Sequence, residues 1–224
     1  MLRVLLATLI TLTVQSASAQ ECVTLDDFSS SVVGAFPMGW RPRNASGMSV
    51  YRVQLENGTR YVSAKSKGLG VEADHRMGWD VAQYPVLTWK WRPKSFPSHA
   101  NERSGHNDSA LGVYVGFDKA KASLKYIWSE QVELGAEWAV GLFDRTKMHV
   151  LVTGSPADAS IWHSVRVDIA NDYRRRLGRS LVEPAAGISI LTDADDTHST
   201  AAGDYADFRA CTAHTTTPTS QPQL

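Results

Sequence analysis

The sequence lacks most of the features that identify a protein's activity directly. It contains no phosphate-binding P-loop, no GxSxG nucleophile motif and no HExxH zinc motif, so it gives no support for an NTPase, an α/β-hydrolase or a zincin. Its seven histidines are scattered and form no Cys/His zinc pattern. Charge of one sign is also absent, because 23 basic residues balance 23 acidic ones. This balance gives no electrostatic reason to expect nucleic acid or an anionic membrane as a partner.

A long hydrophobic run is missing too. The apolar run near the start covers residues 4–14, whereas a membrane-spanning helix needs about 20 residues. Arg3 precedes this run and Ala17-Ser18-Ala19 follows it, which is the pattern of a secretory signal peptide. We therefore expect residues 1–19 to be removed by cleavage after Ala19. The mature protein would then be periplasmic or secreted, with no membrane span.

Cysteine is scarce, with only Cys22 and Cys211 in the chain. In an oxidising compartment two cysteines favour a disulfide, and two buried free thiols are the alternative. A disulfide would fasten together the two ends of a single domain over residues 20–211. Residues 212–224 are rich in Thr, Pro and Gln and are expected to be a disordered tail.

The chain is rich in short alternating segments separated by turn residues. Alternation of apolar and polar residues predicts strands with one buried face. Within one of them, Trp89 and Trp91 would face the core, and Lys90 and Arg92 would lie on the opposite, polar face. The expected strands cover residues 51–55, 60–64, 85–92, 110–118, 123–130, 148–154, 162–169 and 187–193.

Helix is expected in one place, residues 171–178, where Gly178 would end it. Many strands, little helix and a single domain predict an all-β sandwich, and we expect a jelly roll. Two longer loops, residues 93–107 and 193–204, connect strong strands. Loops on a rigid β scaffold are where binding groups tend to lie.

The polar sheet face carries the first set of candidate ligand-binding residues. Lys90 and Arg92 form a cationic pair that could hold an acidic sugar or a carboxylate. Cross-strand salt bridging explains the same two residues equally well. Asp108, Tyr114 and Tyr126 would line this face or its rim, although Asp108 also suits a hydrogen-bonded loop anchor.

The second set is the acidic cluster Asp193, Asp195 and Asp196. In an extended strand Asp193 and Asp195 share a side, about 7 Å apart. Such a pair suits a hard cation, here a structural calcium ion, or general acid and base groups. The glycine and distal glutamate of an EF-hand are absent. The alternative is a strand end whose aspartates accept turn hydrogen bonds.

A family resemblance is carried by seven segments: PMGW (37–40), YPVLTWKWR (84–92), NDSALGVYVGFD (107–118), LKYIWSE (124–130), WHSVRVDIANDYRRRLG (162–178), ISILTDADDT (188–197) and DYADF (204–208). The tryptophan-rich strand, the DY before a short helix and the late TDxDxT are similar to those of the bacterial family called domain of unknown function 3047. The resemblance implies an exported β-sandwich protein and brings no established catalytic residues. The family often has an arginine at the position of Gly112, a departure that would alter any ligand contact made there. More distantly, residues 26–28 and 205–208 resemble the paired end strands of galactose-binding-like and carbohydrate-binding modules, an analogy of fold.

Three functions remain open at this point. The first is a binding protein for a carbohydrate or cell-envelope glycan. The second is a glycan hydrolase or polysaccharide lyase on the same scaffold, which requires its cationic and proton-transferring groups to converge in one cleft. The third is a structural envelope protein without a small ligand. The groups proposed for the enzyme are Lys90, Arg92, Tyr114, Tyr126 and His106.

Overall fold

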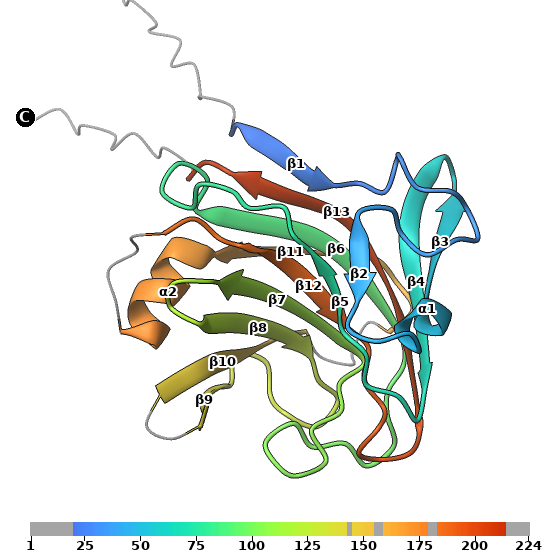
Figure 1. The fold of residues 1–224 in the computed structure, drawn as a ribbon. Coiled ribbons are helices and arrows are strands. Elements are labelled where there is room, and N and C mark those ends of the chain that lie inside the picture. Colours follow the sequence, from blue (N-terminus) through green and yellow to red (C-terminus); the bar gives the residue numbers. More distant parts are fainter. Residues whose placement is uncertain (1–19, 143–144, 155–158, 179–182, 214–224) are drawn as a thin grey trace, which may run out of the picture.

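The computed structural model describes residues 20–142, 145–154, 159–178 and 183–213. Within them the chain forms two β-sheets stacked face to face, with a short helix, α2, at one end of the stack (Figure 1). The predicted all-β sandwich is therefore confirmed. The predicted signal peptide and most of the predicted tail lie outside the described residues.

The first sheet has six strands in the order β11-β6-β13-β4-β3, with β1 beside the last part of β13. All of its neighbouring strands are antiparallel. Its strands are β1 (Cys22–Asp26), β3 (Tyr51–Glu56), β4 (Thr59–Lys67), β6 (Val86–Ser95), β11 (His163–Asp168) and β13 (Thr200–Cys211).

The second sheet has seven strands in the order β2-β5-β12-β7-β8-β10-β9. Its neighbouring strands are antiparallel except for β8 and β10, which run parallel. Its strands are β2 (Trp40–Pro42), β5 (Ala73–His75), β7 (Leu111–Phe117), β8 (Ala122–Trp128), β9 (Glu137–Leu142), β10 (Arg145–Gly154) and β12 (Gly187–Leu191).

Two short helices complete the described fold, α1 (Gly47–Val50) and α2 (Ile169–Leu177). The start of α2 is capped because the Asp168 carboxylate accepts a hydrogen bond from the backbone N–H of Asn171. It ends at Gly178, whose φ of 64° lies in the left-handed region that favours glycine. The helix expected from the sequence is thus confirmed, two residues longer at its start. Neither helix has the length and apolar composition needed to span a membrane.

Large aromatic side chains fill the space between the sheets. Trp89 and Trp91 of β6 are fully buried, as their alternation predicted. Trp89 lies 5.7 Å from Tyr126 of β8, and Trp91 lies 5.4 Å from Trp128, between ring centroids. These tilted and edge-to-face contacts join the two sheets across the core.

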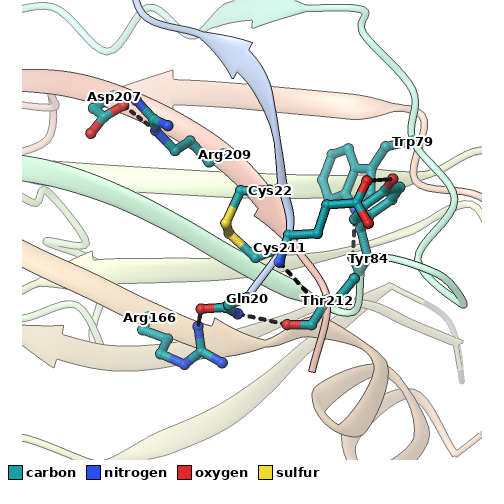
Figure 2. Close-up of a disulfide and its surroundings, with 10 residues drawn as sticks. Gln20, Cys22, Trp79, Tyr84, Arg166, Asp207, Arg209, Cys211 and Thr212 are labelled. Carbon is teal, nitrogen blue, oxygen red and sulfur yellow. Dashed lines mark hydrogen bonds and ion pairs between the residues drawn. A yellow bond between two sulfur atoms is a disulfide. The ribbon is translucent and has the colours of Figure 1, made fainter. Parts of the chain in front are cut away.

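The two ends of the domain are tied together by the predicted disulfide between Cys22 and Cys211, which is confirmed. The two cysteines are direct partners in the antiparallel pairing of β1 with β13. Figure 2 shows Gln20 beside this bridge, where its side-chain amide donates to the Thr212 carbonyl at 2.6 Å. Arg166 of β11 donates to the Gln20 side chain at 3.0 Å, so a third strand also holds this end of the chain.

Candidate functional site

The outer face of the seven-stranded sheet carries a row of polar side chains. Pairing across β5, β12, β7 and β8 places Asp74, Ser189, Tyr114 and Lys125 directly opposite one another. Neighbouring strands lie about 4.8 Å apart, so this polar row spans about 14 Å of the sheet. The alternate residues of the same strands face the core, which directs the row away from the six-stranded sheet.

The row continues with apolar residues on the next two strands. Val150 of β10 is the partner of Lys125, and Trp138 of β9 is the partner of Val150. Trp138 packs against a small cluster around Val150, and the Arg103 guanidinium lies 5.2 Å from its ring centroid. The outer face therefore has a polar half and an aromatic half along one line.

Lys125 is the cation at the centre of this face, and its residue is only 5% exposed. Its ammonium group hydrogen bonds with Tyr114 and lies 5.2 Å from the centroid of that ring. Burial by itself lowers the pKa of Lys125, but Tyr114, Asp193 and Glu102 stabilise its charged form and raise the pKa above its ordinary value. Lys125 is therefore a positively charged donor at neutral pH.

The side chains of Lys125 and Tyr114 lie over Gly112. A Cβ atom at Gly112 would lie 3.5 Å from Cε of Lys125 and 3.7 Å from Cε2 of Tyr114. These two side chains thus cover the position in ordinary van der Waals contact. A long side chain at this position would have to displace them.

Two carboxyl groups, those of Glu72 and Asp74, lie at the β5 end of the polar row. Burial raises the pKa of Glu72, and the neighbouring charge of Asp74 raises it further. A hydrogen bond with Ser189 and the charge of Arg43 act in the opposite direction. Arg43 approaches Glu72 to 3.4 Å from the exposed side. The pair thus places a carboxyl with a raised pKa next to a second acidic side chain.

A second group of carboxylates lies where the chain leaves β12. One oxygen from each of Asp108, Asp193 and Asp195 falls within 4.8 Å of the others. Burial, and then the charge of Asp195, raise the pKa of Asp193 to about 7. Asp193 and Asp195 lie in the second of the two loops that the sequence singled out as carriers of binding groups, and Asp108 directly follows the first.

Asp108 also holds the two loops together. Its carboxylate accepts hydrogen bonds from the backbone N–H groups of Asp196 at 3.1 Å and Thr197 at 2.8 Å. The Asn107 side chain donates to the Asp196 carboxylate at 2.7 Å. Asp108 is therefore a loop anchor, whereas exposed Asp196 is bound to Asn107 and lies outside the group formed by Asp108, Asp193 and Asp195.

Lys90 and Arg92 lie on the outer face of the other sheet, so the structure does not bring them together with Tyr114. Arg92 forms ion pairs with Asp204 at 2.6 Å and Glu56 at 3.1 Å. Lys90 lies 3.6 Å from Asp207. The cross-strand salt bridges considered from the sequence are present, and they neutralise the predicted cationic patch.

Tyr126 and His106 are also separated from the polar row. Tyr126 is fully buried in the core, where its hydroxyl donates to Asp172 at 2.7 Å. Tyr114 pairs with Lys125, so Tyr126 must point to the opposite face. His106 is an exposed loop residue. The five groups proposed for the enzyme therefore do not converge in one cleft.

A cavity of about 600 Å³ lies on the outer face of the six-stranded sheet, close to Lys90. Its acidic and basic residues are balanced in number. It is lined by Asp27, Ser29, Glu56, Asn57, Gly58, Thr59, Arg60, Tyr61, Lys90, Trp162, Ser164, Ala206, Asp207 and Arg209.

Sequence reasoning missed Glu72, Glu102 and Lys125. Glu72 and Asp74 alternate around a buried alanine, which is the pattern of two acids on one face of a short strand. Lys125 is a single charge between the buried residues of β8, and an isolated buried charge of this kind points to a specific partner. Glu102 is a buried loop carboxyl that accepts a hydrogen bond from Ser129 at 2.7 Å.

Solved structures resemble this fold only distantly. The xyloglucanase domain of NopAA, a type three effector from Sinorhizobium fredii, gives a TM-score of 0.42 at 8% identity, over 77% of this chain and 97% of that one. Endoglucanase 3 of Trichoderma harzianum, from family GH12, gives 0.38 at 10% identity, over 88% and 99%. Likenesses of this size support no functional argument.

No curated protein sequence matches the chain. A family model does match it over residues 38–209, which include most of the described strands of both sheets. Its description is "Protein of unknown function (DUF3047)". The resemblance read from the sequence is confirmed, and the chain belongs to the DUF3047 family.

Proposed function

We propose that the protein binds a glycan on the outer face of the seven-stranded sheet. The observation that carries this proposal is the polar row of Asp74, Ser189, Tyr114 and Lys125, aligned with Trp138. Packing of the sandwich does not require these groups, because the core lies on the other side of the sheet. Carboxylate, hydroxyl and ammonium groups match sugar hydroxyls, and aromatic rings match the apolar faces of sugar rings.

The charge of this face favours a glycan without acidic groups. Acidic residues on the face and its rim outnumber the basic ones, even when the exposed arginines of the sheet edge are included. As long as no cation is bound, an acidic polysaccharide would meet net repulsion here. The acidic groups are Glu72, Asp74, Glu102, Asp108, Asp193 and Asp195, and the basic ones are Arg41, Arg43, Arg103 and Lys125.

Affinity electrophoresis through immobilised polysaccharides tests this proposal. In buffer containing EDTA, we expect retardation by neutral β-glucans or by chitosan, and none by polygalacturonate. Lys125→Met should weaken binding at least tenfold, since it removes the charged donor at the centre of the row and keeps the length of the side chain.

Lys90→Met is the matched control, because Lys90 lies on the outer face of the other sheet and pairs with Asp207. This variant should bind like the wild type. Loss of binding in Lys90→Met with retention in Lys125→Met would move the site to the six-stranded sheet. Absence of retardation across the whole panel would refute the proposal.

Glycan hydrolysis is a second candidate, favoured by the Glu72 and Asp74 pair. Two neighbouring carboxyl groups, one of them with a raised pKa, are an arrangement that suits general acid and base groups. Reducing ends should then appear from the polysaccharide that binds, and Glu72→Gln should abolish their release without abolishing binding. Binding without any release of reducing ends would leave the protein a binding module.

The protein is proposed to work outside the cytoplasm, in the periplasm or as a secreted protein. The disulfide of Cys22 and Cys211 supports this location, because structural disulfides persist in oxidising compartments. N-terminal sequencing of protein recovered from the periplasm or medium should begin at Gln20. Recovery of full-length, reduced protein from the cytoplasm would contradict it.

A further inference from the structure

The carboxylates at the end of β12 are held against the backbone of Gly70. Gly70 and Asp193 form an isolated antiparallel bridge between the two chain segments. A Cβ atom at Gly70 would lie 2.8 Å from Oδ2 of Asp195 and closer still to Oδ1 of Asp193. The absence of a side chain at Gly70 thus lets both acidic groups approach each other beside the same peptide.

Asp193 is one of the two buried members of the group, with only 6% of its surface exposed. Among the described residues, its Oδ1 atom has no hydrogen-bond donor. A buried carboxylate oxygen without a donor is unfavourable unless something else satisfies it. The neighbouring Asp195 cannot do so as a second anion, since carboxylates are acceptors only. A donated proton or a cation would satisfy this oxygen, and the negative charge of the surrounding carboxylates favours a cation.

Charge and geometry agree on what this partner is. Three carboxylates and the nearby ammonium of Lys125 leave two negative charges, which one divalent ion would neutralise. Calcium binds oxygen ligands at about 2.3–2.6 Å, so two ligands of one ion lie up to about 5 Å apart. The ligand oxygens of Asp108, Asp193 and Asp195 all lie within 4.8 Å of one another.

We propose that Asp108, Asp193 and Asp195 bind a hard divalent cation, calcium, between the loop before β7 and the loop after β12. The ion would lie beside the hydrogen bonds that Asp108 receives from Asp196 and Thr197. It would therefore fasten the two loops where they border the polar row. This site is independent of the proposed glycan binding.

Isothermal titration calorimetry on protein stripped with EDTA tests the site. Calcium chloride should bind with a stoichiometry near one, and the melting temperature should rise with calcium concentration. Asp193→Asn should weaken calcium binding at least tenfold. Since this substitution removes a repulsive charge, the calcium-free variant should melt no lower than the calcium-free wild type, which shows that it folds.

Asp196→Asn is the matched control, because its carboxylate is exposed and bonds to Asn107 outside the group. It should bind calcium like the wild type. Equal calcium affinity in Asp193→Asn and the wild type would overturn the proposal. So would the absence of any calorimetric binding signal for the wild type at millimolar calcium. Binding of magnesium in preference to calcium would also overturn it. Stabilisation by acid alone, without any cation effect, would show that a shared proton holds the pair instead.

Discussion

Asp204 is a buried polar residue that we expect to contribute to stability and not to glycan binding. Its side chain is fully buried on β13. The carboxylate accepts hydrogen bonds from Nε of Arg92 at 2.7 Å and from Nζ of Lys94 at 2.8 Å. The change to make is Asp204→Asn, which removes the charge and keeps the shape.

The expected loss is about 3 kcal/mol of the free energy of unfolding. Breaking a buried ion pair by removing one partner costs about 3–5 kcal/mol, because the other charge is left uncompensated. Two features place this case at the lower end. The Lys94 side chain is 38% exposed and can turn to water. Arg92 keeps its ion pair with Glu56 at 3.1 Å and its position 4.5 Å from the Trp162 ring centroid.

Urea denaturation followed by tryptophan fluorescence measures this loss, and the melting temperature should fall by roughly 6–12 °C. The control is Asp207→Asn on the same strand, whose carboxylate pairs with half-exposed Lys90 and Arg209. It should cost less than about 1 kcal/mol. Equal losses in the two variants, or a loss below about 1 kcal/mol for Asp204→Asn, would refute the reasoning. Glycan binding should survive both substitutions.

Three other substitutions test the disulfide, the buried carboxyl pair and the glycine at the acidic group. Replacing Cys22 and Cys211 with serine should lower the free energy of unfolding by up to about 5 kcal/mol in urea, because the bridge closes a separation of 189 residues; a negligible loss would show that strand pairing alone holds the ends. The pKa of Glu72 is raised above its ordinary 4.5, so the folded state keeps a proton that the unfolded state releases, and stability should fall as pH rises from about 4.5 through the raised pKa. Between pH 4.5 and 7.5, the urea midpoint should decline less in Glu72→Gln than in the wild type. An identical decline in the two proteins would show that Glu72 is not the cause. Gly70→Ala should weaken calcium binding in calorimetry, since the new Cβ would displace the carboxylates, and unchanged affinity would place the ion elsewhere.

The sequence predicted the fold well wherever apolar and polar residues alternate clearly within a single strand. The burial of Trp89 and Trp91 follows from a period of two that needs no knowledge of neighbouring strands. The disulfide followed from compartment and from cysteine count. Asp193 and Asp195 were found because they stand two residues apart at the end of a clear strand.

What could not be predicted depends on pairing between distant segments. The sequence analysis placed both Tyr114 and Tyr126 on the polar face of the sheet or its rim. In the structure, the pairing of β7 with β8 sets Tyr114 opposite Lys125 on the outer face, so Tyr126 faces the core. Both faces of β7 and β8 carry apolar residues, so the sequence pattern does not show which residues of the two strands pair. The partner of Arg92 is 112 residues away on β13, so no local pattern could show that its charge is satisfied.

The position of β13 has a consequence for how the chain folds. It is the last described strand along the sequence, yet it lies between β4 and β6 in the middle of its sheet. Until residues 200–211 are available, β4 and β6 expose unpaired edges and their apolar faces. Such long-range pairing is slow and leaves the waiting strands open to aggregation. A chain that emerges from its amino end first must therefore remain open until almost all of the domain has been released. The proposed export would meet this requirement, because the chain would cross the membrane unfolded and form its disulfide on the far side.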